Sequence, residues 1–272
     1  KGTARMHHFM VPVDGSVESW RVFDVVVELA RRRQGTIEVV RVVFDPDDVQ
    51  DAEMGLEAGL HDRVIGDVDI SSAVQLFCGS VAETICLMVA SRPQATVVIA
   101  SRGQGRSAAL LGSVAEDVVR LLDGPVVIVG PQAGVSDFSG PIIVTVDGSD
   151  ISEAVIPIAA AWSLELGVDA CVTRVVPSSG DAVGAADVRE YVSSLAARFR
   201  TLSGRSAEVK VLVGRDVEAA VAESARAVGA SLIVTSTRGR SGPARFVLGS
   251  TASGFVRRAS CPVLAIRPKH TR

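Results

Sequence analysis

The segment Val11-Pro12-Val13-Asp14-Gly15-Ser16 returns 133 residues later as Val144-Thr145-Val146-Asp147-Gly148-Ser149. Two further segments recur in the same order. Leu111-Gly112-Ser113 returns as Leu248-Gly249-Ser250, and Gly124-Pro125-Val126-Val127-Ile128-Val129 returns as Cys261-Pro262-Val263-Leu264-Ala265-Ile266, both after 137 residues. Solenoid repeats are much shorter, about 20–50 residues. We infer that a whole domain is duplicated, and we expect one domain at 1–134 and a second at 141–272, joined by a linker rich in turn-forming residues.

Each half alternates short segments rich in Val and Ile with patterns of helical spacing. We expect strands near 8–14, 36–44, 72–78, 95–101 and 125–130, and again near 141–147, 169–176, 207–213, 231–236 and 262–267. Helices are expected at 17–33, 81–91, 113–122, 151–166, 185–203, 217–229 and 250–259. This order predicts an α/β fold, with an open five-stranded parallel sheet and flanking helices in each half. The segment 46–67 is rich in Asp and Gly, and we expect it to be partly irregular.

The composition limits the classes of partner and compartment. A net charge of −3 without a basic stripe argues against a nucleic-acid partner. No apolar run approaches the roughly 18–20 residues needed to span a bilayer, and no signal peptide is visible. The four cysteines lack C-x-x-C spacing and lie in apolar segments, so we expect small buried side chains in a reducing cytoplasm. No spacing of potential ligands suggests a metal site.

A loop of small and basic residues follows the fourth expected strand of the second half. It contains Gly239 and leads to Gly249-Ser250-Thr251, which open a helix. Free amides at a helix start bind anions, and glycines let a ligand approach the backbone, so the segment fits a phosphate cradle. An ordinary strand–loop–helix connection with Ser250 as N-cap fits the same residues. The residues alone leave both interpretations open.

Asp14 and Asp147 each end the first expected strand of their half. Asp-Gly-Ser is typical of a turn, and Asp150 with Glu153 resembles a capping box. A carboxylate at such a strand end can instead accept a hydrogen bond from a ribose hydroxyl. Because parallel sheets bind ligands at the carboxyl ends of their strands, either half could hold a site there.

These segments together resemble the universal stress protein family, over nearly the whole chain and as two tandem copies. The resemblance is carried by the V-x-V-D-G-S strand end, the Gly-rich loop and the closing C-P-V-L-A-I strand. Members that bind nucleotide carry G-x-x-G, nine residues, and then G-[ST]. The second half has Ser236-x-x-Gly239, nine residues and Gly249-Ser250, and so departs only at the first glycine. The first half has Ala100-x-x-Gly103 and only eight residues before Gly112-Ser113.

The resemblance implies that the two halves pair as a pseudo-twofold dimer, with tandem chains forming a homodimer. It implies ATP or a related adenine nucleotide as ligand, with or without Mg²⁺. Asp14 and Asp147 would then meet adenine or ribose, and Val42 and Val175 would offer backbone groups to the adenine. The phosphates would be held by Gly103, Gly112, Ser113, Gly239, Gly249, Ser250 and Thr251.

The expected function is that of a cytoplasmic stress-response regulator or sensor that binds adenine nucleotide and acts with an unknown protein partner. The alternative is a nucleotide-independent interaction protein of the same fold. A true ATPase or nucleotidyl-transfer enzyme is the third class, and we do not expect it, since no general base or Mg²⁺-binding carboxylate pair is recognisable beside the cradle. The shorter loop in the first half predicts weaker binding there than in the second half.

Overall fold

The computed structural model describes residues 7–61, 63, 66–92, 94–103, 111–177, 182–237 and 248–267, with only the backbone described at 182–185. The chain divides into two compact units, Lys1–Val129 and Gly130–Arg272. The expected linker, 131–140, thus belongs to the second unit. Its Phe138 is fully buried, and the carbonyl of Gly229 lies where a Cβ at Gly140 would have to sit. The end of the segment is therefore anchored to that unit by Phe138 and Gly140, while most of its other residues are exposed or half-buried.

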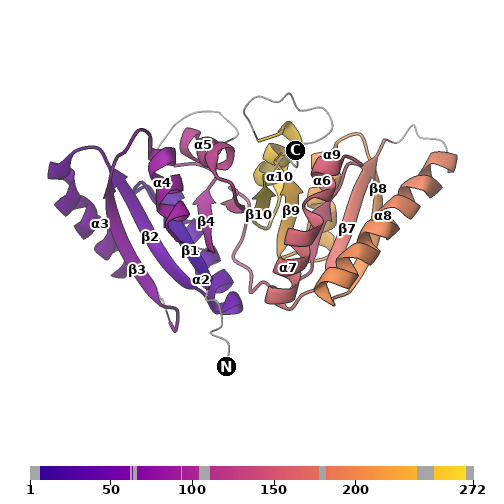
Figure 1. The fold of residues 1–272 in the computed structure, drawn as a ribbon, viewed down its shortest axis with the longest axis horizontal. Helices are drawn as coiled ribbons and strands as arrows, with labels where there is room; N and C mark the ends of the chain where they lie inside the picture. The colour runs from indigo at the N-terminus through magenta and orange to yellow at the C-terminus, as the bar shows by residue number, and fades with distance from the viewer. Residues whose placement is uncertain are drawn as a thin grey trace. The chain divides into compact units, whose positions relative to one another are not determined.

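Strands and helices alternate along each unit, as the ribbon shows (Figure 1). The strands of the first unit are β1 His8–Pro12, β2 Thr36–Val43, β3 Ile70–Leu76, β4 Ala95–Ala100 and β5 Val126–Val129. Its helices are α1 Val17–Trp20, α2 Val22–Arg33, the 3₁₀ turn η1 Pro46–Asp48, α3 Val49–His61, α4 Val81–Ala90 and α5 Ser113–Leu121.

The second unit repeats this order. Its strands are β6 Ile142–Thr145, β7 Ala170–Val176, β8 Ala207–Val213, β9 Leu232–Ser236 and β10 Val263–Ile266. Its helices are α6 Asp150–Glu153, α7 Ile156–Leu166, α8 Ala182–Ser203, α9 Val217–Ala227 and α10 Ser250–Arg258. The prediction of a duplicated α/β fold is confirmed. None of the helices in the described part of the chain is long and apolar enough to cross a bilayer.

The strand order is the same in both units and sets where a ligand could bind. It reads β3-β2-β1-β4-β5 in the first and β8-β7-β6-β9-β10 in the second, with parallel neighbours inside each unit. The chain moves outward from β1 to β3 and then returns to the other side of β1. The order therefore reverses between β1 and β4, and between β6 and β9, which is where α/β sheets form a ligand crevice.

The inner strands are nearly continuous apolar segments because helices cover both faces of the sheet there, whereas the outer strands β3 and β8 have no buried residue. Phe9, Met10 and Ile37 are fully buried in the first unit, as are Ile142 and Phe255 in the second. At the amino ends of the first unit's strands, the carboxylate of Glu38 pairs with Arg92 at 2.7 Å and with His8 at 3.2 Å. This polar cluster lies at the end of the sheet opposite to the candidate site.

The expectation that 46–67 is partly irregular is wrong for most of the segment. Residues 46–61 form η1 and α3, with Ala52 and Leu56 buried one helical turn apart. One of the glycines that suggested irregular structure, Gly59, has a packing role instead. A Cβ at Gly59 would lie 2.3 Å from Cζ2 of Trp20, so only glycine lets α3 lie this close to that ring.

Two other expectations also need correction. The helix expected at 151–166 is divided into α6 and α7, and Pro157 lies in the first turn of α7, where its missing amide costs no bond within that helix. The helix expected at 17–33 is likewise divided, at Arg21, which keeps helical dihedral angles.

Among the cysteines, Cys171 and Cys261 are buried as expected, and burial raises their thiol pKa values to about 11 and about 12. Cys78 is exposed, because it lies in the turn that follows β3.

The contact between α3 and Trp20 predicts opposite effects for two glycines of the same helix. Gly59→Ala forces α3 or the indole to move and should lower the free energy of unfolding by about 1–3 kcal/mol, as overpacking does. Gly55→Ala is the matched control. Its new methyl would lie 3.1 Å from Nη1 of Arg41, the end of a flexible side chain, so the gain in helix propensity, about 1 kcal/mol, should dominate. Urea unfolding measures both, and equal effects at the two positions would contradict the packing argument.

Candidate functional site

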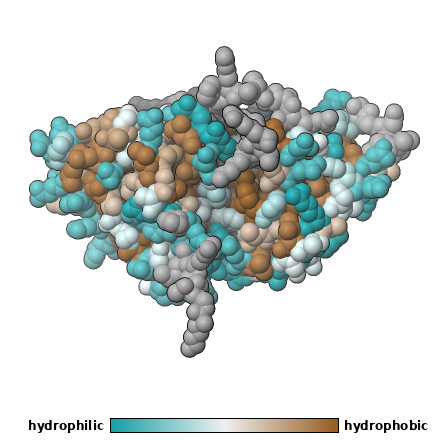
Figure 2. Space-filling model, viewed as in Figure 1, coloured by the Kyte–Doolittle hydropathy of each residue, from teal (hydrophilic) through white to brown (hydrophobic). Residues whose placement is uncertain are grey.

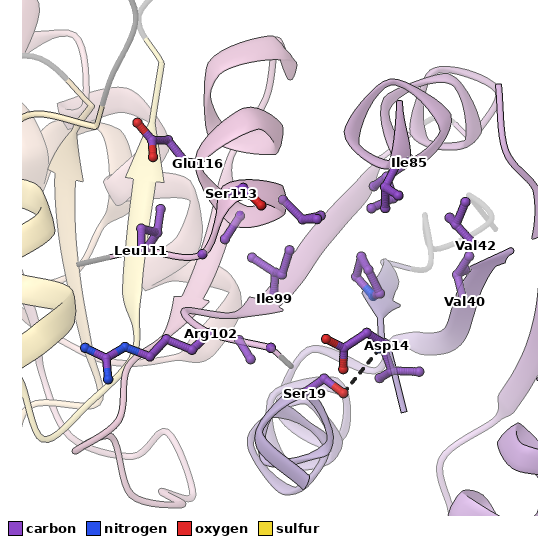
Figure 3. Close-up of a pocket in the computed structure, with 18 of the residues that line it drawn as sticks. Asp14, Ser19, Val40, Val42, Ile85, Ile99, Arg102, Leu111, Ser113 and Glu116 are labelled. Carbon is purple, nitrogen blue, oxygen red and sulfur yellow. Dashed lines mark hydrogen bonds between the residues drawn. The ribbon is translucent and has the colours of Figure 1, made fainter. Parts of the chain in front are cut away.

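A cavity of about 400 Å³ lies at the carboxyl ends of the first unit's strands (Figure 3). This volume is within the range of about 300–1,000 Å³ that is usual for small-molecule sites. Its walls come from the ends of β1, β2 and β4 and from α4 and α5. Apolar side chains form much of the lining: Val13, Val40, Val42, Phe44, Val81, Ile85, Ile99, Leu111 and Val114. The cavity therefore opens at the reversal of strand order that the topology identifies.

All five candidate residues of the first half line this cavity: Asp14, Val42, Gly103, Gly112 and Ser113. They come from four separate places in the chain, and the sheet brings them together. The lining also includes residues that the sequence did not single out, among them Phe44, Ile85 and Arg102. Period-two alternation from Val42 could have found Val40 and Phe44, because strand residues two apart share a face.

Asp14 begins the turn that Asp-Gly-Ser predicts, and it also lines the cavity. Its Oδ1 accepts from the amide of Ser16 at 2.9 Å and from its hydroxyl at 2.6 Å, which fixes the Asp-Gly-Ser turn. Gly15 has a φ of 86°, which favours glycine at that position. Ser16 then caps α1 by accepting from the amide of Ser19. The turn thereby holds the carboxylate at the cavity.

The other oxygen of Asp14 lies against the loop that follows β4. A Cβ at Gly103 would come within 2.2 Å of Oδ2, so a side chain there would displace the carboxylate. This approach follows from the topology, because β1 and β4 are hydrogen-bonded neighbours and their carboxyl ends lie side by side. Gly103 is thus needed for the close approach of the Asp14 carboxylate, whereas the resemblance assigns it to the phosphates, a role that stays a prediction.

Val42 offers backbone groups to the cavity because β1 ends before β2 does. The amide of Val13 donates to the carbonyl of Val40 at 2.9 Å. In a parallel ladder, Val42 directs its N–H and C=O toward the same side as Val40 does, which is the side of β1. At the level of Val42, the β1 segment has already turned away at Asp14. The second unit has the same arrangement, with Val146 donating to Thr173 at 3.0 Å and Val175 two residues further on.

Helices α5 and α10 begin at glycines. The N-caps are Gly112 and Gly249, so the alternative in which Ser250 is the N-cap is wrong, while the phosphate cradle stays a prediction. A glycine has no side chain to cap the first amides, whereas Ser80 and Asp216 cap α4 and α9. The first turn of α5 lines the cavity, and such a helix start favours an anion.

The second unit places its candidate residues in the equivalent positions. Asp147 accepts from the amide and hydroxyl of Ser149 at 2.9 and 2.6 Å, and Gly249 donates to Thr237 as Gly112 does to Ser101, both at 2.8 Å. The cap of α6 is Ser149, so the capping box suggested for Asp150 and Glu153 is wrong. Ser250 and Thr251 open α10. Gly239 lies outside the described residues.

The first unit's cavity has two chemically different ends. In Figure 3, Val40, Val42 and Ile85 form one side, while Arg102 and Glu116 extend away from them on the other. The carboxylate of Asp14 lies between these groups, and Ser113 lies at the start of α5. A planar apolar group fits the first side, a hydroxyl fits Asp14, and an anion fits the helix start.

The universal stress protein family matches this sequence twice, at residues 6–130 and 139–267. The chain belongs to the universal stress protein family. A universal stress protein of Mycolicibacterium smegmatis is 32% identical over 202 residues, which cover 70% of this chain and 67% of that protein. The crystal structure of a universal stress protein from Archaeoglobus fulgidus has a TM-score of 0.67 and 18% identity, and covers 98% of this chain and 100% of its own.

A second protein of the family from Archaeoglobus fulgidus has been solved in complex with dAMP. It is 26% identical, has a TM-score of 0.41, and covers 48% of this chain and 99% of its own.

The contact between Asp14 and Gly103 predicts a coupled pair of substitutions. Gly103→Ala should displace the Asp14 carboxylate and weaken its bonds with Ser16, lowering the free energy of unfolding by about 1–3 kcal/mol. In an Asp14→Ala background the same substitution should cost much less, because the displaced oxygen is absent. Gly112→Ala is the control, since its Cβ would meet the carbonyl of Ser101 at an ordinary 3.5 Å. A double-mutant cycle by thermal or urea unfolding gives the coupling, and strictly additive effects would contradict the contact.

Proposed function

We propose that this universal stress protein binds ATP or a related adenine nucleotide at the carboxyl ends of its strands. The observation that carries the proposal is the cavity of the first unit, where Asp14, Val42 and the glycine-capped start of α5 meet. The strand order brings these three groups to one space. Their chemistry matches the three parts of a nucleotide.

Each part of the ligand has a matching group. The backbone N–H and C=O of Val42 form the hydrogen bonds of the adenine edge, between apolar side chains. Asp14 accepts from a ribose hydroxyl with Oδ2, while Oδ1 stays engaged with Ser16. The amides of the first turn of α5 and the hydroxyl of Ser113 hold phosphate oxygens. In the second unit Asp147, Val175, Ser250 and Thr251 have these roles.

A regulatory role fits this chemistry better than a catalytic one. Asp14 is held in its turn by two hydrogen bonds to one oxygen, which suits a fixed acceptor more than a group that exchanges protons. We therefore propose a cytoplasmic stress-response sensor or regulator whose nucleotide state is read by a protein partner, with tandem chains pairing as homodimers and with no nucleic-acid ligand. The alternative is an interaction protein that needs no nucleotide.

Mass spectrometry of small molecules released from purified, denatured protein separates these alternatives. The proposal predicts an adenine nucleotide at a stoichiometry near one or two per chain. Calorimetry with added ATP, ADP and AMP covers the case in which the ligand is lost on purification. If no nucleotide is released and none of the three gives heat of binding, the result favours the interaction protein.

The two sites should differ in affinity for ATP. Nine residues separate Gly239 from Gly249, whereas eight separate Gly103 from Gly112. A shorter loop should misplace one or two amides, each worth roughly 1.5–3 kcal/mol toward a charged group, so the first site should bind ATP roughly tenfold to several thousandfold more weakly. Gly249→Val, which places a branched side chain at the phosphates, should remove the tighter phase of an ATP titration. Gly112→Val should remove the weaker phase, and the reverse pattern would show that the assignment of sites is backwards.

A further inference from the structure

Two neighbouring phenylalanines of the first unit, one of which lines the cavity, are exposed. Phe44 lines the cavity and has 69% of its surface open, and Phe77 has 38%. Their ring centroids are 4.8 Å apart with planes inclined by 39°, which is a normal separation for a packed aromatic pair. Figure 2 shows that hydrophobic residues interrupt the hydrophilic surface of the first unit in this view. Large apolar groups left in water beside a cavity are a mark of ligand sites.

The backbone fixes the position of this pair. Phe44 directly follows β2, and Phe77 directly follows β3. The amide of Phe77 donates to the carbonyl of Val43 at 2.8 Å, which ties the end of β3 to the end of β2. Because Phe44 is two residues beyond Val42, both residues line the same cavity. The ring is thus beside the backbone groups that hydrogen-bond the base, with Phe77 packed against it.

The second unit has the same backbone without the aromatic rings. Its matching bond runs from the amide of Gly214 to the carbonyl of Val176 at 3.0 Å. This bond identifies Gly214 as the counterpart of Phe77, and the β7 register makes Pro177 the counterpart of Phe44. The aromatic pair is therefore a further difference between the two units, besides the length of the loop before α5 and α10.

We propose that Phe44, supported by Phe77, is the surface on which the ligand's base stacks in the first unit, a contact that is independent of the number of phosphates. This inference rests on the proposed nucleotide binding and adds a base-binding residue to it. An aromatic ring binds a planar base by stacking, which does not depend on charge. The contribution of the ring should then be the same for adenosine, AMP and ATP at the first site, and the second site lacks it.

The test is calorimetry on the full-length chain with adenosine, AMP and ATP, carried out in a Gly249→Val background that isolates the first site. Phe44→Ala should weaken all three ligands by a similar factor of about 5- to 140-fold, the range found when stacking rings are removed. Phe44→Trp should retain binding, and Phe77→Ala should give a smaller loss. Leu87→Ala is the matched control, because Leu87 is an apolar residue of α4 with 59% of its surface exposed and does not line the cavity.

The outcomes separate this inference from the proposed function. If the parent chain binds none of the three ligands, the proposed function fails and the inference fails with it. If the parent binds them and Phe44→Ala leaves all affinities unchanged, or weakens ATP alone, nucleotide binding stands and the stacking role is wrong. If Phe44→Ala changes only the self-association measured by light scattering, the ring pair is a protein contact, and the stacking role is again wrong.

Discussion

The close approach of the Asp14 carboxylate to the backbone at Gly103 is the constraint on which the candidate site depends. The two residues are 89 positions apart in the sequence, yet they follow strands that are hydrogen-bonded neighbours. Any side chain at Gly103 would occupy the position of Oδ2. The reversal of strand order, the Asp-Gly-Ser turn and the glycine after β4 therefore form one arrangement, in which each part requires the others.

After the duplication, both units kept the same framework of turns and backbone hydrogen bonds, while the side chains at the ends of some strands came to differ. The turn at Asp147 repeats the bond lengths of the turn at Asp14 within 0.1 Å, and the same backbone bonds precede α5 and α10. The side chains after the second and third strands of each unit do not repeat. The positions of Phe44 and Phe77 are occupied by Pro177 and Gly214 in the second unit. A framework held by backbone bonds tolerates such changes, because those bonds do not depend on side-chain identity. The tandem chain can therefore hold two sites with one geometry and different preferences.

Sequence patterns predicted the fold well where burial alone decides structure. The apolar strands lie close to their expected positions, because strands covered on both faces have few alternatives. The prediction was wrong at α3, where Gly59 reads as a helix breaker but serves to admit the ring of Trp20. At the start of α10 the residues left Ser250 open as an N-cap, and the structure has Gly249 in that position. In both cases a contact distant in sequence, or a neighbouring backbone, reverses the local preference.

The sequence by itself determined the duplication, the α/β class and the residues at which strand ends and helix starts could bind a ligand. These features follow from local composition and spacing, so no knowledge of distant contacts was needed. Only the tertiary structure decided that Asp14, Val42 and the start of α5 face one cavity, and that Phe44 stands beside it with Phe77. Those relations depend on strand order and register, which bring together segments from separate parts of the chain and which no local pattern encodes.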